Sequence, residues 1–207
     1  MECAGIKENS CGNPSRKMTH HLLNKLIDEA TDDFLVSSDW EKNLQICEQI
    51  NNLDDGVVFA KAIKRQLGSQ SKRTRERTIE LLQTGMQNNY WVVRGVHSPD
   101  VLNSLIDLIR SPSFDNSLKN QLLNLVRAWG EAYQDNSYGL PNFTSTFQFL
   151  RSRNFSFPSK TDDSNYSPPQ MPQPKPVAPV VSQPRVIFFP VFIFIIFLIQ
   201  YFSQIIL

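Results

Sequence analysis

The most constraining feature of this sequence is the spacing of its apolar residues, which recur with the period of an α-helix. The clearest run forms one continuous helical stripe: Leu118, Leu122, Leu125, Val126, Trp129 and Tyr133. The same period recurs from Thr19 onward, and no useful length of chain alternates apolar and polar residues as a strand would. The spacing predicts helices over residues 20–30, 40–52, 56–67, 71–89, 92–96, 98–110, 118–133 and 142–151. An all-α body of about eight helices follows.

Two of the expected helices have strong start signals. Before Trp40, the Ser38 hydroxyl and the Glu41 carboxylate are spaced as a capping box, so we expect Ser38 to cap that helix. The second signal is Ser98-Pro99-Asp100, which combines a capping residue, a proline at the first helical position and an acid at the positive end of the helix dipole. Both signals indicate short loops before well-defined helices.

The polar residues of the chain argue against an enzyme. The cysteines and histidines are too few and too scattered for a zinc site or a disulfide framework: Cys3, Cys11, Cys47, His20, His21 and His97. No phosphate-binding loop or nucleophile-elbow motif is present. The balance of 21 Lys+Arg against 20 Asp+Glu excludes a strongly basic nucleic-acid-binding protein. We therefore expect no catalytic residue, no cofactor, no metal and no nucleic-acid partner.

Composition divides the chain into four parts. Residues 1–18 are polar and are expected to be disordered, and residues 19–158 form the helical body. Residues 159–185 are rich in proline and are expected to form a disordered linker. This linker contains two P-x-x-P spacings, Pro169 to Pro172 and Pro176 to Pro179, so it is either a plain spacer or a ligand for an SH3 domain.

The fourth part is an apolar tail, residues 186–207, which contains no charged residue. A bilayer core requires about 20 mostly apolar residues in a helix, so the tail is a candidate transmembrane helix. Arg185 before it favours a cytosolic position for the body. The tail would then anchor the body on the cytoplasmic face of a membrane. The alternative is a segment that arises from an error in the gene model.

The helix that begins at Trp40 is the first candidate binding element. Its apolar arc is wider than one neighbouring helix requires, and Trp40 and Leu44 lie at the edge of that arc. Two interpretations remain open from the helix alone. The pattern by itself favours burial of Trp40 between neighbouring helices. The alternative is partial exposure of both side chains as an apolar spot for a partner.

A stretch of basic residues across the next interhelical loop is the second candidate. It contains a single acid, Glu76, among seven cations: Lys61, Lys64, Arg65, Lys72, Arg73, Arg75 and Arg77. Anionic lipid headgroups attract such clusters, by about 1 kcal/mol per basic residue at the membrane surface. Phosphoinositide binding is therefore one interpretation of the stretch, and an ordinary solvated surface is the other.

Four blocks of the sequence resemble the VHS domain in their order and spacing. They are LIDEATDDFLVSSDWEKNLQICEQIN at residues 26–51, GVVFAKAIKRQL at 56–67, LLNLVRAWGEAYQD at 122–135 and FLRSRNFSFP at 149–158. The resemblance implies a right-handed superhelix of eight helices. It also implies a relation to the endosomal and Golgi sorting adaptors of the Hrs, STAM, TOM1 and GGA groups.

The resemblance further implies a ubiquitin-binding site. In the family, a Trp and a Leu of the second helix contact the apolar patch of ubiquitin, and they correspond to Trp40 and Leu44 here. This implies that both side chains are exposed. The fourth helix departs from the family pattern, as does Asn88-Asn89-Tyr90 after it. Asp107 stands where the GGA-type site for acidic-dileucine signals requires a lysine.

The function expected from these observations is that of a non-enzymatic adaptor in vesicle trafficking. It would bind ubiquitin or ubiquitinated membrane cargo weakly at endosomal or Golgi membranes. The alternatives are a module that binds phosphoinositides or other anionic lipids through the basic stretch, and a truncated adaptor fragment without an independent role.

Overall fold

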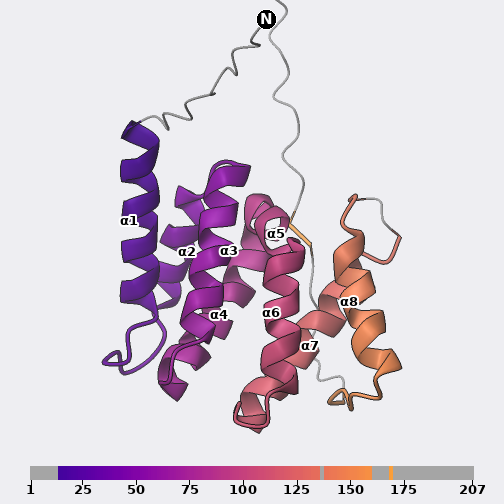
Figure 1. Cartoon of the computed structure of the whole chain (residues 1–207). Coiled ribbons are helices and arrows are strands. Elements are labelled where there is room, and N and C mark those ends of the chain that lie inside the picture. The colour runs from indigo at the N-terminus through magenta and orange to yellow at the C-terminus, as the bar shows by residue number, and fades with distance from the viewer. Residues whose placement is uncertain (1–13, 136–137, 160–167, 170–207) are drawn as a thin grey trace, which may run out of the picture. The chain divides into compact units, whose positions relative to one another are not determined.

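The computed structural model describes residues 14–135, 138–159 and 168–169 of the 207-residue chain. Within those ranges the chain forms eight α-helices and no strand: α1 (Pro14–Ala30), α2 (Trp40–Gln49), α3 (Leu53–Leu67), α4 (Lys72–Asn88), α5 (Tyr90–Val96), α6 (Pro99–Arg110), α7 (Asn116–Ala132) and α8 (Pro141–Ser152). The helices follow one another in space from α1 to α8 (Figure 1). The all-α class expected from the apolar spacing is confirmed.

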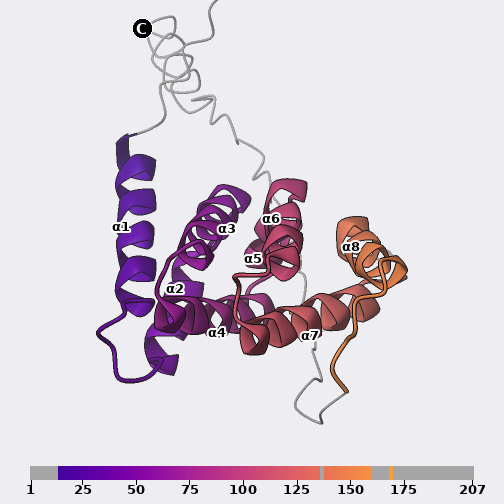
Figure 2. The same cartoon turned by 60° about the horizontal axis from the view of Figure 1, so that its bottom comes forward.

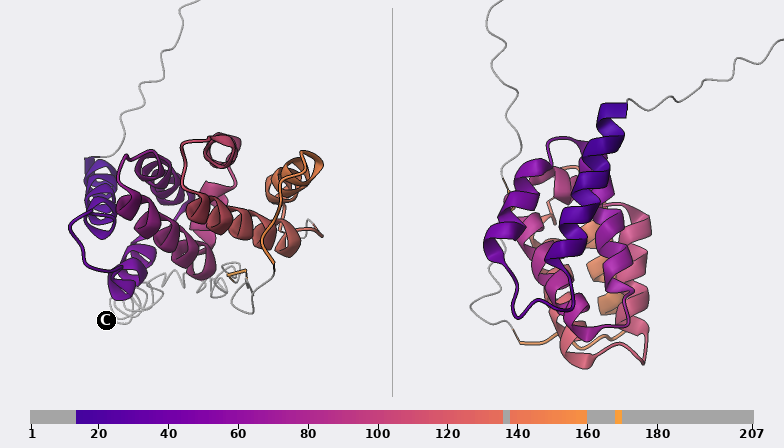
Figure 3. Two further views of the ribbon diagram at one scale, coloured as in Figure 1. Left: turned by 90° about the horizontal axis from the view of Figure 1, so that it is seen from below. Right: turned by 90° about the vertical axis from the view of Figure 1, so that its left-hand side faces the viewer.

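The helices are arranged in two directions. Figure 2 shows α4 and α7 along one side, with α1, α3, α6 and α8 standing at an angle to them. The views in Figure 3 again place α1 at one end of this array and α8 at the other. The main difference from the sequence expectation is that α1 begins at Pro14 rather than near residue 20. The fixed φ of proline suits the first helical position, so Pro14 can start the helix.

Most helix starts are capped by a side chain of the preceding residue. The Asn52 amide oxygen accepts a hydrogen bond from the Asp55 N–H at 3.0 Å, and the Ser71 hydroxyl accepts one from the Thr74 N–H at 3.2 Å. At α6 the helix begins at Pro99 as expected, but the Ser98 side chain makes no capping bond. Polar residues between the apolar runs therefore determine where these helices begin.

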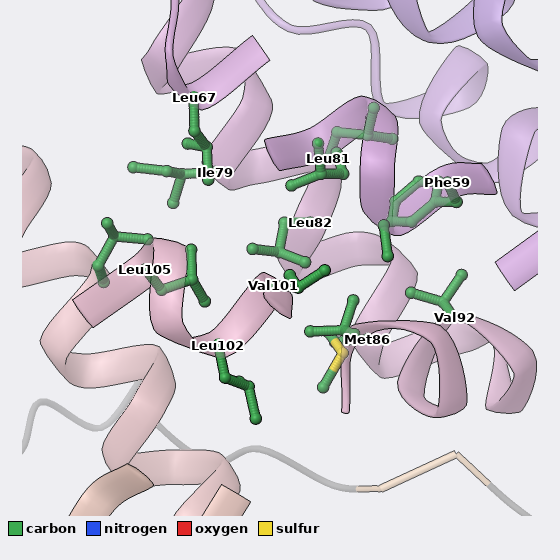
Figure 4. Packing of buried hydrophobic residues seen from close by; sticks show 14 of the residues in the cluster. Phe59, Leu67, Ile79, Leu81, Leu82, Met86, Val92, Val101, Leu102 and Leu105 are labelled. Atoms are coloured by element: carbon green, nitrogen blue, oxygen red, sulfur yellow. The ribbon is translucent and has the colours of Figure 1, made fainter. Parts of the chain in front are cut away.

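One hydrophobic core extends through the helices. Figure 4 shows its central part, where leucine, isoleucine, valine and methionine side chains of α3 to α6 gather together with Phe59. At the other end, Trp129 and Tyr133 from α7 pack against Phe143 of α8, with ring centroids 5.6 and 5.1 Å from the Phe143 ring. All four of these aromatic side chains are almost completely buried. Burial of this apolar surface stabilises the array.

Two glycines join α3 and α5 at a crossing where the two backbones touch. A β-carbon added to Gly56 would lie 2.0 Å from the carbonyl oxygen of Trp91. A β-carbon added to Gly95 would lie 2.1 Å from the carbonyl oxygen of Gly56. Both distances are far shorter than van der Waals contact, so the two backbones can touch only because neither residue has a side chain.

The junction between α5 and α8 depends on His97. The backbone N–H of Asn142 donates to His97 Nε2 at 3.1 Å, and the Asn142 side-chain amide donates to the His97 carbonyl at 3.0 Å. His97 thus caps the start of α8, where Leu140 provides no capping side chain. Burial, with a smaller contribution from the positive charge of Arg94, lowers the pKa of His97 below its usual value. The neutral ring is required because Nε2 is a hydrogen-bond acceptor here.

We expect Gly95→Ala to lower the free energy of unfolding by about 3 kcal/mol, the upper end of the usual cost of overpacking. The reason is that the new methyl group would meet backbone atoms, which cannot rotate away. Urea denaturation followed by circular dichroism measures the effect. Gly68→Ala is the matched control, since Gly68 is exposed with a helical φ of −76°, and it should change stability by less than about 1 kcal/mol. Equal losses in the two variants would contradict the tight crossing.

We expect the stability of the chain to depend on pH through His97. Because folding lowers the pKa of His97, its contribution is complete above the ordinary histidine pKa of about 6.5 and is lost as the pH falls below that value toward the lowered pKa. His97→Gln keeps an acceptor but cannot titrate in this range. Thermal melts at pH 5 to 7.5 should therefore show a steeper loss of stability toward acid in the wild type than in His97→Gln. Parallel curves would refute this role for His97.

Candidate functional site

The first candidate residue, Trp40, stands at the exposed start of α2. Asp39 caps this helix, because its carboxylate accepts a hydrogen bond from the Lys42 N–H at 3.0 Å. The expectation that Ser38 is the cap is wrong, since the Ser38 hydroxyl instead donates to the carboxylate of Glu80 on α4. These bonds fix the start of α2, and 67% of the Trp40 side chain remains exposed. The burial favoured by the helix pattern alone is therefore wrong.

Leu44 lies one helical turn after Trp40 on the same face of α2. It is partly buried, whereas Asn43, Ile46 and Cys47 on the inner face are buried. The outer face of α2 therefore carries two apolar side chains, Trp40 and Leu44, that are not fully buried in the core. The structure brings together the two residues that the family resemblance identified.

A hollow of about 390 Å³ begins at Leu44 and continues between the ends of α2 and α4. Its lining comes from α2 and the turn after it, and from the end of α4: Leu44, Cys47, Glu48, Ile50, Asn51, Asn88 and Asn89. The sequence alone indicates no role for Asn88 and Asn89 beyond their departure from the family pattern. The hollow makes them part of the candidate surface.

Asn89 holds the two sides of this hollow together. Its side-chain amide donates to the carbonyl oxygens of Cys47 and Ile50, at 2.8 Å each. Its side-chain oxygen accepts hydrogen bonds from the backbone N–H groups of Trp91 and Val92, at 2.8 and 3.2 Å. One residue therefore satisfies the last carbonyls of α2 and the first amides of α5. The position of Leu44 relative to α4 is fixed by this connection.

The structure separates the basic stretch rather than forming one cationic surface. Three of its members pair with acids from distant parts of the chain: Lys64 with Asp100 at 2.7 Å, Arg65 with Asp28, and Lys72 with Asp115 at 3.1 Å. The hydrogen bond in the last pair raises the pKa of Lys72 and lowers the pKa of Asp115. These charges are partly compensated within the fold.

The remaining members of the stretch have different environments. Arg75 donates to the Ser69 carbonyl at 2.6 Å and lies over the Phe114 ring, 5.0 Å from its centroid. Arg77 is buried and donates to the Leu35 carbonyl. Among the seven basic residues of the stretch, only Lys61 and Arg73 are exposed and have no hydrogen bond or ion pair within the described ranges. Lipid binding by the stretch stays a prediction.

Comparison with protein families agrees with this geometry. The model of the VHS domain matches residues 17–153, which is well over half of the chain.

The chain belongs to the VHS domain family.

The most similar curated relatives found include plant and slime-mould proteins. TOM1-like protein 2 of Arabidopsis thaliana is 34% identical over 170 residues, which are 79% of this chain and 43% of that protein. TOM1-like protein 1 of the same plant is 30% identical over 141 residues, 68% of this chain and 34% of the relative. Target of Myb protein 1 of Dictyostelium discoideum is 27% identical over 147 residues, 69% and 21% of the two chains. This VHS chain thus spans less than half the length of these relatives.

A solved structure confirms the VHS fold. The tandem VHS and FYVE domains of Hrs, a protein involved in membrane trafficking and signal transduction, superpose with a TM-score of 0.58 at 22% identity. The superposition covers 68% of this chain and 65% of that one. The eight described helices therefore form the right-handed superhelix that the resemblance implied.

The VHS body has a second hollow, of about 260 Å³, between α6 and α8. Leu102, Ile106 and Phe149 provide its apolar lining. Asp107, the residue that departs from the GGA pattern, is exposed on α6 and is not among the lining residues. No basic residue lines this hollow, but Arg110 and Arg153 line an adjoining hollow of about 180 Å³ that shares Phe149.

Two further expectations concern membranes and metals. Among the described residues, no helix combines the length and the apolar character needed to cross a bilayer. In the same ranges, no group of three or more His, Cys, Asp or Glu side chains is arranged to hold a metal ion. The apolar tail at 186–207 and most of the proline-rich linker lie outside the described residues. Tail anchoring and SH3 binding therefore stay predictions.

We expect Cys47 to be chemically inert although it lines the hollow. Burial raises the pKa of its thiol to about 12, so almost no thiolate is present at pH 8. In the chain with Cys3→Ser and Cys11→Ser, Ellman's reagent should react with Cys47 only after urea is added. Labelling at a similar rate before and after urea would show that the hollow opens onto the thiol.

Proposed function

We propose that this chain is a non-enzymatic VHS adaptor that binds ubiquitin, or ubiquitinated membrane cargo, weakly through Trp40 and Leu44. The observation that carries the proposal is the 67% exposure of Trp40 on a capped, fixed helix start. Tryptophan combines a large apolar surface with little conformational freedom, which makes it a common anchor in protein interfaces. A partner that covers Trp40 and Leu44 would remove this apolar surface from water.

The hollow beside Leu44 supports a protein partner rather than a small substrate. Its lining mixes apolar side chains with asparagine amides and the Glu48 carboxylate. The only nucleophilic side chain in it is the Cys47 thiol, whose high pKa disfavours chemistry at neutral pH. A surface of this composition suits weak recognition, because the side-chain amides of Asn51 and Asn88 already bond to the chain itself.

We place this activity in membrane trafficking, at endosomal or Golgi membranes. The support is membership of the VHS family, similarity to TOM1-like proteins and the description of Hrs as a protein involved in membrane trafficking. The compartment and the cargo are proposals for this chain. Attachment through residues 186–207 would bring the body close to membrane-bound cargo, and it is part of the same proposal.

We expect Trp40→Ala and Leu44→Ala each to remove most ubiquitin binding by the full chain. Truncation of an interface anchor typically costs about 2 kcal/mol of binding free energy or more. Titration of isotope-labelled ubiquitin with the full chain, followed by chemical shifts, measures the affinity. The exposed side chain makes little contact with the core, so Trp40→Ala should leave the melting temperature nearly unchanged.

Gln45→Ala is the matched control, because Gln45 is exposed on the same helix but outside the apolar pair. It should bind ubiquitin as the wild type does. If Trp40→Ala folds normally and still binds ubiquitin with wild-type affinity, the partner uses another surface. If the wild type at millimolar concentration causes no change in the chemical shifts of labelled ubiquitin, the proposed function is wrong.

A further inference from the structure

The loop between α1 and α2 exposes two apolar side chains beside the candidate surface. Phe34 is 94% exposed and Val36 is 102% exposed, and among the described residues no other large apolar side chain is as accessible. Trp40 follows four residues after Val36, also exposed. Exposed large apolar side chains that lie within a few residues of one another favour an interaction site. Phe34 and Val36 therefore add exposed apolar side chains shortly before Trp40 in the chain, and neither belongs to the core.

Several bonds hold this loop in place. The Asp32 carboxylate accepts the N–H of Phe34 at 2.8 Å, and Asp33 accepts the Ser71 hydroxyl of the α4 cap at 2.6 Å. The Leu35 carbonyl, which lies between these two residues in the chain, accepts a hydrogen bond from the guanidinium of the buried Arg77. The loop is thus attached to α4 through the Asp33 carboxylate and the Leu35 carbonyl. Both side chains are presented to solvent in a fixed loop, which reduces the entropy lost on binding.

Three exposed charges of the loop and of the outer face of α2 are acidic and, among the described residues, unpaired. Asp32 in the loop and Glu41 and Glu48 on the outer face of α2 are exposed, and within the described ranges none has an ion-pair partner. The basic residue of this helix, Lys42, lies 3.7 Å from Glu29 of α1 and is thereby partly compensated. The apolar residues are therefore bordered by uncompensated carboxylates. Such a border attracts a basic surface and repels an anionic lipid bilayer.

We propose that Phe34 and Val36 form one recognition surface with Trp40 and Leu44, and that it binds a protein face with an apolar centre bordered by Lys or Arg. This inference rests on the proposed function, in which that protein is ubiquitin. The loop adds apolar contact area beyond α2, and the acidic border selects the basic partner. The hollow after Leu44 ends this surface on the opposite side from the loop.

The first test removes the apolar loop contacts. We expect Phe34→Ser with Val36→Ser to weaken ubiquitin binding by the full chain about fivefold, because two exposed apolar side chains no longer leave water. The melting temperature should not change, since both side chains are outside the core. Leu22→Ser is the matched control, as Leu22 is 49% exposed on α1, and it should leave binding unchanged.

The second test removes the acidic border. Glu41→Gln with Glu48→Gln should weaken binding about threefold at low salt and less at high salt, because charge attraction is screened. Asp107→Asn removes an exposed charge on α6 and is the control that should have no effect. Binding by the wild type that does not depend on salt would overturn the basic character of the partner.

The outcomes separate this inference from the proposed function. If Trp40→Ala removes ubiquitin binding but the loop variant binds as the wild type does, the loop inference alone is overturned. If the wild type does not bind ubiquitin, both are overturned. The full chain is also sedimented with phosphatidylcholine–phosphatidylserine vesicles. Vesicle binding that the loop variant loses would show that Phe34 and Val36 enter membranes, which overturns the protein partner.

Discussion

The contact between the backbones of Gly56 and Gly95 is the constraint on which the arrangement of the array depends. It sets α5 directly against α3, closer than any pair of side chains would allow. From that position, Asn89 at the start of α5 reaches the last carbonyls of α2, and His97 at its end caps α8. A short helix thus connects both halves of the fold. The candidate surface depends on the same contact, because Asn89 fixes where α2 ends relative to α4.

The apolar spacing was sufficient to predict the helices, because each has to bury one face in a shared core. Features that depend on a distant partner could not be predicted in this way. Ser38 has the right spacing for a cap, but Glu80 lies within reach of its hydroxyl and Asp39 caps the helix instead. The exposure of Trp40 is a similar case, since helical periodicity gives the angle of a residue but not how far a neighbouring helix extends. Here the family resemblance provided the missing information about the neighbours.

Charge is the property for which sequence proximity was least informative. The basic stretch is continuous along the chain, yet Asp28, Asp100 and Asp115 come from three other helices or loops to pair with its members. The carboxylates near Trp40 are separated in sequence and were not recognised as a group. Among the described residues, Asp32 of the loop and Glu41 and Glu48 of α2 have no such partner. Compensation of charge by tertiary contacts, rather than local density, therefore decides which surface can attract a partner.

Arg77 holds the backbone of the loop that carries the exposed apolar residues. The residue is 6% exposed and donates to the Leu35 carbonyl, while Nε and Nη1 find no acceptor within the described residues. A buried cation with unmatched N–H groups is costly, so loss of the Leu35 carbonyl would leave it still worse satisfied. Leu35 is thereby held against α4, and the exposed side chains of Phe34 and Val36 stand on either side of that attachment. Contacts within the fold therefore fix the backbone from which these two side chains extend.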